Sequence, residues 1–476
     1  MAYEAVIGLE VHVQLRTNTK LFCGCPNRSG GVPNTQVCPV CLGYPGVLPV
    51  MNEQAIKLTV QSGLLIGCAI NLRSKWDRKN YFYPDQPKNY QITQYDEPLC
   101  LGGGVPIDVD GVSRDVGITR IHLEEDVGKS MHFTSSSGVD FNRAGTPLME
   151  IVTEPDMTSA DEAFAFLTAL KQVLAYGEVS DCNLEEGNIR CDVNCSVRPV
   201  GQATFGVKTE IKNMNTFKGV HRALSHEIER QKTVLAKGGV IQQETRRWDD
   251  VGGMTHAMRS KEYAHDYRYF PEPDLMPVVL MEADVKAWGE ALPERPRDRR
   301  LRFIEAYGLP EYDADVLVAE KGVADFYEEA AKLSGNFKAV SNWVMTELLR
   351  VLSEGSLAVS QVKITPAGLA ELVGLVDDKT INSSAAKEVF QNMLEEGGSP
   401  GDIVKARGLV QVSDSSALDA FVEEAIAANP QSVEAFRSGK ENAIQHLMGQ
   451  VMRLSRGKAN PKMVVEMLRQ RLKSGD

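Results

Sequence analysis

The sequence predicts an α+β protein in which a β-rich domain comes first and helical domains follow. Up to about residue 290, short runs of alternating apolar and polar residues are mixed with glycines and aromatic–proline clusters. Pro293 and Pro296, followed by several arginines, then mark a linker, and beyond it apolar residues recur at helical spacing. Because 476 residues are too many for one hydrophobic core, we expect domains at 1–292, 293–408 and 409–476.

The first element is a predicted strand over residues 6–15, VIGLEVHVQL. Apolar and polar side chains alternate there, so that one face enters the core. Glu10 and His12 then lie side by side on the opposite face, about 6–7 Å apart. A carboxylate beside an imidazole suits metal binding or proton transfer. An ordinary half-exposed strand also explains this run, and the run alone favours that interpretation.

Helical spacing predicts the later elements in order. Two helices, at 159–174 and at about 220–236, interrupt the β-rich part. Farther on, the Thr365-Pro366 pair predicts a helix start and Gly397-Gly398 a helix stop. Asn460 and Pro461 open the last helix. The apolar stripes that support the helices after residue 292 are Val340, Trp343, Val344, Leu348 and Val351, then Leu369, Leu372, Val373 and Val376, then Ile444, Leu447, Met448, Val451 and Met452.

Composition excludes several classes of protein. The hydrophobic fraction of 43% and the charged fraction of 24% are those of an ordinary globular protein. No apolar run approaches the ~20 residues that span a membrane, and we see no signal peptide, so we expect a cytoplasmic protein with reduced thiols. With a net charge of −12, nucleic-acid binding must use local basic patches. Leu123 stands where a phosphate-binding loop ending at Lys129-Ser130 needs glycine, which excludes that motif.

The strongest general motif is a set of four cysteines in two close pairs, Cys23-x-Cys25 and Cys38-x-x-Cys41. This spacing predicts a tetrahedral zinc site. All four ligands come from the protein, so the zinc is expected to be structural. Four unlinked thiols are the alternative. The remaining cysteines lack pairing and are expected to be small core residues: Cys68, Cys100, Cys182, Cys191 and Cys195.

Two glutamates lie in apolar surroundings. Glu150 interrupts the apolar run LMEIV, and Glu125 shares a predicted strand face with Ile121 and Leu123. A lone ionised carboxylate there costs several kcal/mol unless it finds a cation. Together with Glu10 and His12, they could hold Mg²⁺, which prefers oxygen ligands. Separate buried salt bridges to arginines such as Arg120 and Arg143 are an equally good explanation of either glutamate.

Two further predicted strands, at 189–198 and 207–212, carry charges on one face. Arg190 and Asp192 alternate with buried positions in the first strand, and Lys208 and Glu210 do so in the second. Cross-strand salt bridges on a solvated surface are the common explanation. The same pattern suits the floor of a nucleotide site, where basic groups bind phosphates and acids hold the metal.

Three segments combine basic residues with features typical of RNA contacts. Aromatic and basic side chains alternate in residues 78–96, which include Lys79, and in residues 261–274. Such side chains can stack on bases and bind phosphates, although a self-packed loop is the alternative. Residues 453–473 form a basic patch or an ordinary solvated helix face. Its basic residues are Arg453, Arg456, Lys458, Lys462, Arg469, Arg471 and Lys473.

The whole chain closely resembles the B-subunit family of the glutamyl/aspartyl-tRNA amidotransferases. The resemblance is carried, in order, by VIGLEVHVQL, YPGVLPVMN, DRKNYFYPDQPKNYQI, GITRIHLEEDVGKS, NRAGTPLMEIVTEPD, EEGNIRCDVN, EIKNMNTFKGV, QETRRWDD, DYRYFPEPDL and GQVMRLSRGKANP. It implies a cradle-shaped mixed-sheet catalytic domain, a helical domain and a tail that contacts tRNA.

The resemblance also implies an activity. A family member phosphorylates the side-chain carboxylate of Glu-tRNA(Gln) or Asp-tRNA(Asn) with ATP and Mg²⁺. Ammonia from a glutaminase-type A subunit then displaces the phosphate, which makes the complex a carbon–nitrogen ligase, and a small C subunit joins the two large ones. A non-catalytic tRNA-binding scaffold is the alternative.

The resemblance assigns roles to the residues as well. Glu10, His12, Glu125 and Glu150 are implied as the metal-binding and catalytic set, so that Glu125→Gln is expected to abolish phosphoryl transfer. Zinc ligation by four cysteines occurs in only part of the family, which supports a structural role. The implied nucleotide contacts are Lys79, Arg190, Asp192, Lys208 and Glu210.

Overall fold

The computed structural model describes residues 2–184, 186–258, 267–411, 415–455 and 459–473. The chain forms two compact units, Met1–Pro296 and Arg297–Asp476. The first unit therefore ends within the proline-rich linker, slightly beyond the expected residue 292. The first unit is built on a sheet and the second on helices, so the α+β prediction is confirmed.

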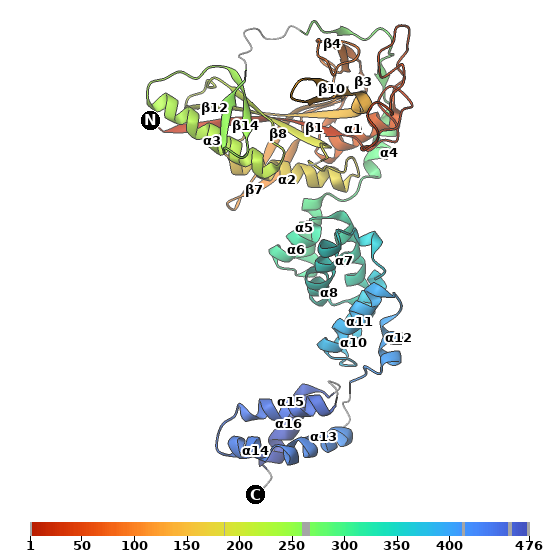
Figure 1. Ribbon diagram of the computed structural model, residues 1–476, viewed down its shortest axis with the longest axis vertical. Coiled ribbons are helices and arrows are strands. Elements are labelled where there is room, and N and C mark those ends of the chain that lie inside the picture. The colour runs from red at the N-terminus through yellow and green to blue at the C-terminus, as the bar shows by residue number, and fades with distance from the viewer. Residues whose placement is uncertain (1, 185, 259–266, 412–414, 456–458, 474–476) are drawn as a thin grey trace. The chain divides into compact units, whose positions relative to one another are not determined.

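A mixed sheet organises the first unit (Figure 1). Within the described residues it has 13 strands, and its main path runs β15-β14-β13-β12-β1-β11-β8-β5-β4-β16. Strands β13 and β14 are parallel, and the other pairs along this path are antiparallel. The path strands are β1 (Tyr3–Gln14), β4 (Asp77–Asn80), β5 (Tyr90–Thr93), β8 (Val112–Glu125), β11 (Pro147–Thr153), β12 (Ile189–Pro199), β13 (Thr209–Lys212), β14 (Glu244–Asp249), β15 (Met254–Ala257) and β16 (Phe270–Pro271).

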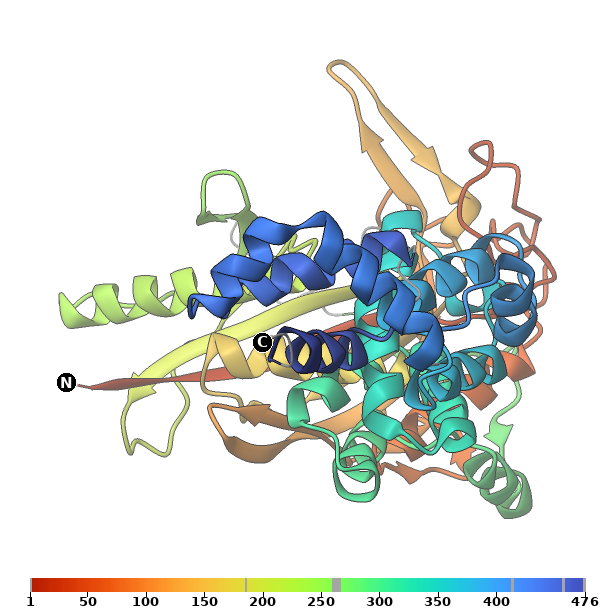
Figure 2. The same ribbon diagram turned by 90° about the horizontal axis from the view of Figure 1, so that it is seen from below.

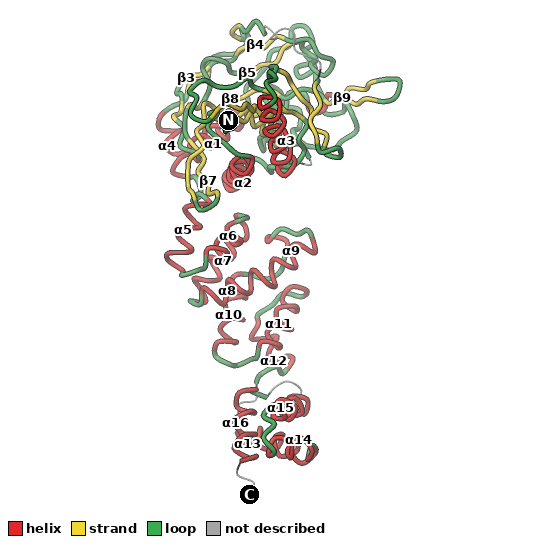
Figure 3. Tube along the Cα trace, turned by 90° about the vertical axis from the view of Figure 1, so that its left-hand side faces the viewer, coloured by secondary structure: helices red, strands yellow, loops and turns green. Residues whose placement is uncertain are grey.

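The shorter strands lie beside this path or apart from it. Strands β2 (Ala69–Ile70), β6 (Cys100–Leu101) and β7 (Gly104–Val109) extend the sheet next to β8. Strand β3 (Arg73–Ser74) pairs with β17 (Val278–Val279). The hairpin of β9 (Lys129–His132) and β10 (Ser137–Asp140) forms its own small sheet, and Figures 2 and 3 show it projecting from the unit.

Helices cover one face of the sheet. They are α1 (Glu53–Leu65), α2 (Ala160–Tyr176) and α3 (Phe217–Ala236), with α4 (Glu282–Glu290) packed against α1. Helices α2 and α3 lie side by side (Figures 1 and 3). Side chains of Asn52, Ser159 and Thr216 accept backbone hydrogen bonds at the three helix starts, which explains where these helices begin. The apolar side chains of β1 are buried in the core of this unit, so the polar side chains of β1 occupy the opposite face.

The second unit is helical. One apolar cluster spans Phe303–Val404 and another spans Leu418–Leu472. The expected boundary near 408 stays a prediction. The helices are α5 (Pro296–Tyr307), α6 (Glu311–Val318), α7 (Lys321–Ser334), α8 (Phe337–Trp343), α9 (Leu349–Gly355), α10 (Pro366–Asp377), α11 (Ser383–Glu395), α12 (Pro400–Arg407), α13 (Ser415–Ala428), α14 (Pro430–Arg437), α15 (Ala443–Leu454) and α16 (Pro461–Lys473).

Three further sequence predictions concern basic or apolar segments. In the predicted basic patch, Arg453, Lys462 and Arg469 are exposed, whereas Arg456 and Lys458 lie outside the described residues. Residues 261–266 of the second aromatic segment also lie outside them. Among the described residues, no helix is both long enough and apolar enough to cross a membrane.

Candidate active site

Strand register assembles one polar surface on the face of the sheet opposite α2 and α3. His12 on β1 lies opposite Glu150 on β11, and Glu150 lies opposite His122 on β8. On the other side of β1, His12 faces Arg190 and Glu10 faces Asp192 on β12. Because facing residues point to the same side of a sheet, these side chains share one surface. Their period-two spacing was visible in the sequence, but their register was not.

The centre of this surface is formed by His12, Glu124 and Glu150, which we refer to as the acidic group. Their ligand atoms all lie within 4.8 Å of one another. His12 Nε2 is 3.3 Å from Glu150 Oε2 and 3.9 Å from Glu124 Oε1. His122 Nε2 approaches the same two carboxylates at 3.6 and 3.9 Å. Thr93 donates a hydrogen bond to Glu124 Oε2 at 3.3 Å. Two carboxylates and two imidazoles thus lie together, and His12, Glu124 and Glu150 are close enough to share one metal ion.

Neighbouring side chains oppose the effect of burial on the pKa values of this group. Glu124 and Glu150 are only 3% and 9% exposed. Burial raises the pKa of both carboxyls, but His122, His12 and Lys79 outweigh it and hold both pKa values below the ordinary range. Burial likewise lowers the pKa of His12, whereas Glu150 and Glu124 raise it overall. The charges of Glu124 and Glu150 also raise the pKa of Lys79, against the effect of its own burial. The site is therefore a compact set of opposite charges.

Glu125 does not belong to this group. Its side chain forms an ion pair with Lys88 and accepts a hydrogen bond from the Ile92 amide at 2.9 Å. It lines a separate small cavity of about 20 Å³ together with Cys41 and Gly145. The structure therefore replaces Glu125 by its neighbour Glu124 as the acid next to His12 and Glu150. The physical reason is strand alternation, which puts Glu124 on the same face as His122.

Glu10 lies beside the group without joining it. Asn194 donates a hydrogen bond to Glu10 Oε1 at 3.0 Å. Glu10, Asn194 and Lys208 line a cavity of about 450 Å³ with Phe205 at its wall. This volume is typical of a site for a nucleotide-sized ligand. The cavity thus adjoins the acidic group along β1.

The other predicted nucleotide contacts are held by partners that the sequence analysis did not identify. Arg190 donates to the buried Asp126 at 2.7 Å. Lys212 contacts both Asp192, at 2.7 Å, and Glu210, at 3.1 Å. Burial lowers the pKa of Lys212, but these two carboxylates raise it overall. The charged faces of 207–212 and 120–126 contain Lys212 and Asp126, so the sequence offers both as candidates. Only the fold shows that Asp126 pairs with Arg190 and that Lys212 pairs with Asp192.

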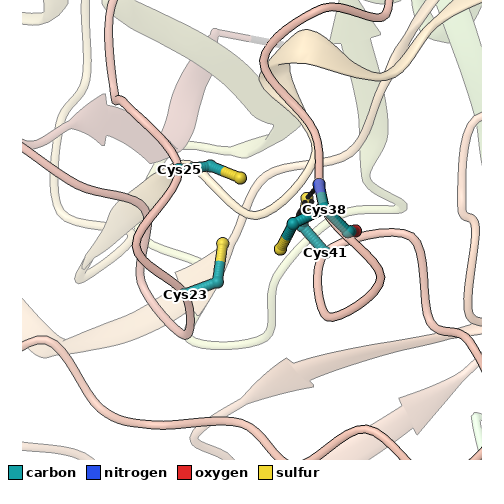
Figure 4. A group of neighbouring side chains, drawn as sticks. All are labelled: Cys23, Cys25, Cys38 and Cys41. Atoms are coloured by element: carbon teal, nitrogen blue, oxygen red, sulfur yellow. Dashed lines mark hydrogen bonds between the residues drawn. The ribbon is translucent and has the colours of Figure 1, made fainter.

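The four predicted cysteines come together in one cluster with sulfur atoms within 4.8 Å of one another. Figure 4 shows Cys23 and Cys25 facing Cys38 and Cys41 across a small gap. The Cys38 and Cys41 sulfurs are 4.0 Å apart, close to the roughly 3.8 Å that zinc–sulfur bonds of about 2.3 Å require in a tetrahedron. The Cys38 amide donates to the Cys41 sulfur at 3.2 Å, and the Lys20 ammonium lies 3.7 Å from it. These residues fit a zinc ion.

Comparisons with known proteins find relatives along the whole chain. Residues 5–286 match the family described as the GatB/GatE catalytic domain, and residues 325–472 match the GatB domain. Proteins named as the B subunit of aspartyl/glutamyl-tRNA(Asn/Gln) amidotransferase are similar along the whole chain. The protein from Caldicellulosiruptor bescii is 52% identical over 477 residues, covering 99% of each chain. That from Thermoanaerobacter sp. strain X514 is 51% identical over 473 residues, covering 99% of this chain and 100% of the relative. That from Brevibacillus brevis is 49% identical over 474 residues, covering 99% of each. This chain belongs to the family of aspartyl/glutamyl-tRNA(Asn/Gln) amidotransferase B subunits.

Proposed function

We propose that this chain activates the side-chain carboxylate of Glu-tRNA(Gln), Asp-tRNA(Asn) or both by phosphorylation with ATP. Ammonia then displaces the phosphate to give Gln-tRNA(Gln) or Asn-tRNA(Asn). The observation that carries this proposal is the buried group of His12, Glu124 and Glu150 next to a nucleotide-sized cavity. The similarity to proteins named as subunits of a tRNA amidotransferase supports it.

The residues of the acidic group fit a magnesium ion. Mg²⁺ is commonly bound by one or two carboxylates together with substrate phosphates, and Glu124 and Glu150 offer two ionised carboxylates. When bound, Mg²⁺ supplies charge neutralisation at the transferring phosphoryl group. His12 either donates a hydrogen bond to Glu150 or serves as a third ligand of the metal ion. In this proposal Lys79, whose charge interacts with both glutamates, binds a phosphate oxygen.

In this proposal the cavity next to Glu10 takes ATP. Gly8, Phe205 and Lys208 line this cavity, so an aromatic ring and an ammonium are available to a base and a phosphate. Arg190 and Lys212 stand on neighbouring strands of the same surface. Both are held by carboxylates, which orients them and keeps them charged. The chain's residues thus mainly position two substrates and balance their charge.

The remaining parts of the chain support this role in the proposal. The cysteine cluster binds a structural zinc and holds the loop after β1. A glutaminase-type A subunit supplies ammonia, a small C subunit completes a heterotrimer, and the helical tail contacts tRNA through its exposed basic residues. An acyl phosphate hydrolyses readily in water, which is why ammonia from a partner must reach it in a closed path.

ATP turnover by the purified complex tests the proposal. The complex is assayed with free ammonium and no glutamine, with and without mischarged Glu-tRNA(Gln). Hydrolysis that depends on mischarged tRNA and yields Gln-tRNA(Gln) supports it. Tight tRNA binding without any turnover contradicts it and favours a non-catalytic tRNA-binding scaffold.

A further inference from the structure

Four tyrosine rings form a continuous cluster beside the acidic group; we refer to Tyr81, Tyr95, Tyr267 and Tyr269 as the tyrosine platform. Tyr95 and Tyr269 stack face to face, with ring centroids 4.0 Å apart and planes inclined by 9°. Tyr267 meets Tyr269 edge-on at 6.0 Å and Tyr81 at 6.2 Å. Tyr95 is 55% exposed, so the stack presents an aromatic surface to solvent.

The platform is anchored by buried charges. The Tyr95 amide donates to the Asp77 carboxylate at 3.2 Å, and Lys75 bridges Asp77 and Asp96 at 3.1 and 2.8 Å. Asp77 is 2% exposed. These bonds hold the backbone of Tyr95, and stacking on Tyr269 packs one face of its ring.

A second set of bonds fixes the other half of the platform. The Asn80 side chain donates to the carbonyls of Tyr267 and Arg268 at 3.2 and 2.8 Å. The backbone N–H of Asn80 also donates to the Tyr267 carbonyl, at 2.9 Å. Arg78 on the same strand forms a two-pronged ion pair with Glu272, both bonds at 2.7 Å. These contacts join segments almost two hundred residues apart in sequence, so the tertiary fold creates the platform.

Lys79 connects the platform to the acidic group. Its ammonium lies 4.9 Å from the centre of the Tyr267 ring, and its charge acts on Glu124 and Glu150. The sheet order places the group on β1, β11 and β8, the cavity toward β12 and β13, and the platform toward β5, β4 and β16. The reacting centre therefore has a binding surface on each side.

We propose that the platform stacks the terminal adenosine of the aminoacyl-tRNA 3′ end. This inference rests on the proposed function for its choice of substrate. The reaction needs two adenosines, one in ATP and one carrying the amino acid, and the proposed function already gives the cavity of about 450 Å³ near Glu10 to ATP. A base that stays attached to a large RNA must enter from solvent, which suits the open Tyr95 face better than the cavity. Unpaired RNA ends are commonly bound by stacking on aromatic rings.

Binding of two uncharged tRNA(Gln) transcripts tests the proposal, one intact and one lacking the terminal adenosine. The complex with its partner subunits is titrated without ATP. Tyr95→Ala is expected to weaken binding of the intact transcript about tenfold, equivalent to ~1.4 kcal/mol, and to leave binding of the shortened transcript unchanged. Tyr95→Phe keeps the ring and is expected to bind like the wild type. Tyr312→Ala, at a tyrosine of α6 that is more exposed than Tyr95, at 71%, is the matched control.

Three results would overturn the proposal. Unchanged binding of the intact transcript would show that Tyr95 does not stack on it. An equal loss for both transcripts would place the contact elsewhere on the tRNA. A higher KM for ATP with unchanged tRNA binding would assign the platform to the base of ATP. Tyr95→Leu, with thermal melting, controls for misfolding. A wild-type complex that binds tRNA without ATP turnover would contradict the proposed function alone, because the platform is tested by binding.

Discussion

Replacing Glu124 and Glu125 one at a time distinguishes the two acids that end β8. Glu124→Gln keeps the size of the side chain but removes one of the two carboxylates that face His12. A bound metal contributes several kcal/mol to transition-state stabilisation, and Glu124 is one of two acids available to hold it. A loss of roughly 3–4 kcal/mol corresponds to a decrease in kcat of about 100- to 1000-fold.

Glu125→Gln is expected to act on stability instead. Lys88 pairs with Glu125 in a buried environment, with side chains 8% and 4% exposed. Removing one charge of such a pair leaves the other uncompensated, which costs about 3 kcal/mol of unfolding free energy. Turnover with free ammonium is expected to stay within about tenfold of the wild type.

The assay measures ATP hydrolysis and Gln-tRNA formation by the complex with free ammonium and mischarged tRNA, alongside urea unfolding of each variant. If Glu124→Gln keeps near-normal kcat while Glu125→Gln abolishes turnover at unchanged stability, the structural assignment is refuted. The residue expected from the sequence would then be the metal ligand.

Two further predictions concern the rest of the first unit. The wild type is expected to bind one zinc ion per chain, measured by metal analysis, and Cys38→Ser is expected to lose the zinc and to melt at a lower temperature. Cys68→Ser is the control and should retain zinc. The Cys68 thiol donates to the Gly102 carbonyl at 2.8 Å, and a serine hydroxyl can also donate there. Burial raises the pKa of Glu227, but Arg230, bonded at 2.6 and 2.9 Å, helps to hold it below the ordinary range. Its contribution to stability is therefore full above the unfolded pKa of about 4.3 and is lost as pH falls through the lower folded pKa. Glu227→Gln should cost roughly 2–3 kcal/mol at pH 7 and progressively less below pH 4 in urea unfolding; a cost independent of pH would contradict this account.

The sequence by itself determined the local patterns of this protein. Alternation in residues 6–15 placed Glu10 and His12 on one strand face because the strand period is two. Helical spacing located α2 and α3 to within a few residues of their observed bounds. The cysteine pairs identified the cluster, since close spacing within each pair leaves few other arrangements.

Only the tertiary structure decided which acid joins His12. Local alternation shows that Glu124 and Glu125 point to opposite faces, but not which face meets Glu150. The register of β8 against β11 pairs His122 with Glu150, and so puts Glu124 on the face that carries Glu150. Lys88, in the connection between β4 and β5, forms an ion pair with Glu125. The tyrosine platform likewise depends on residues 78–95 and 267–269 meeting in space. Register and long-range pairing arise from the packing of the whole sheet, so no short stretch of sequence contains them.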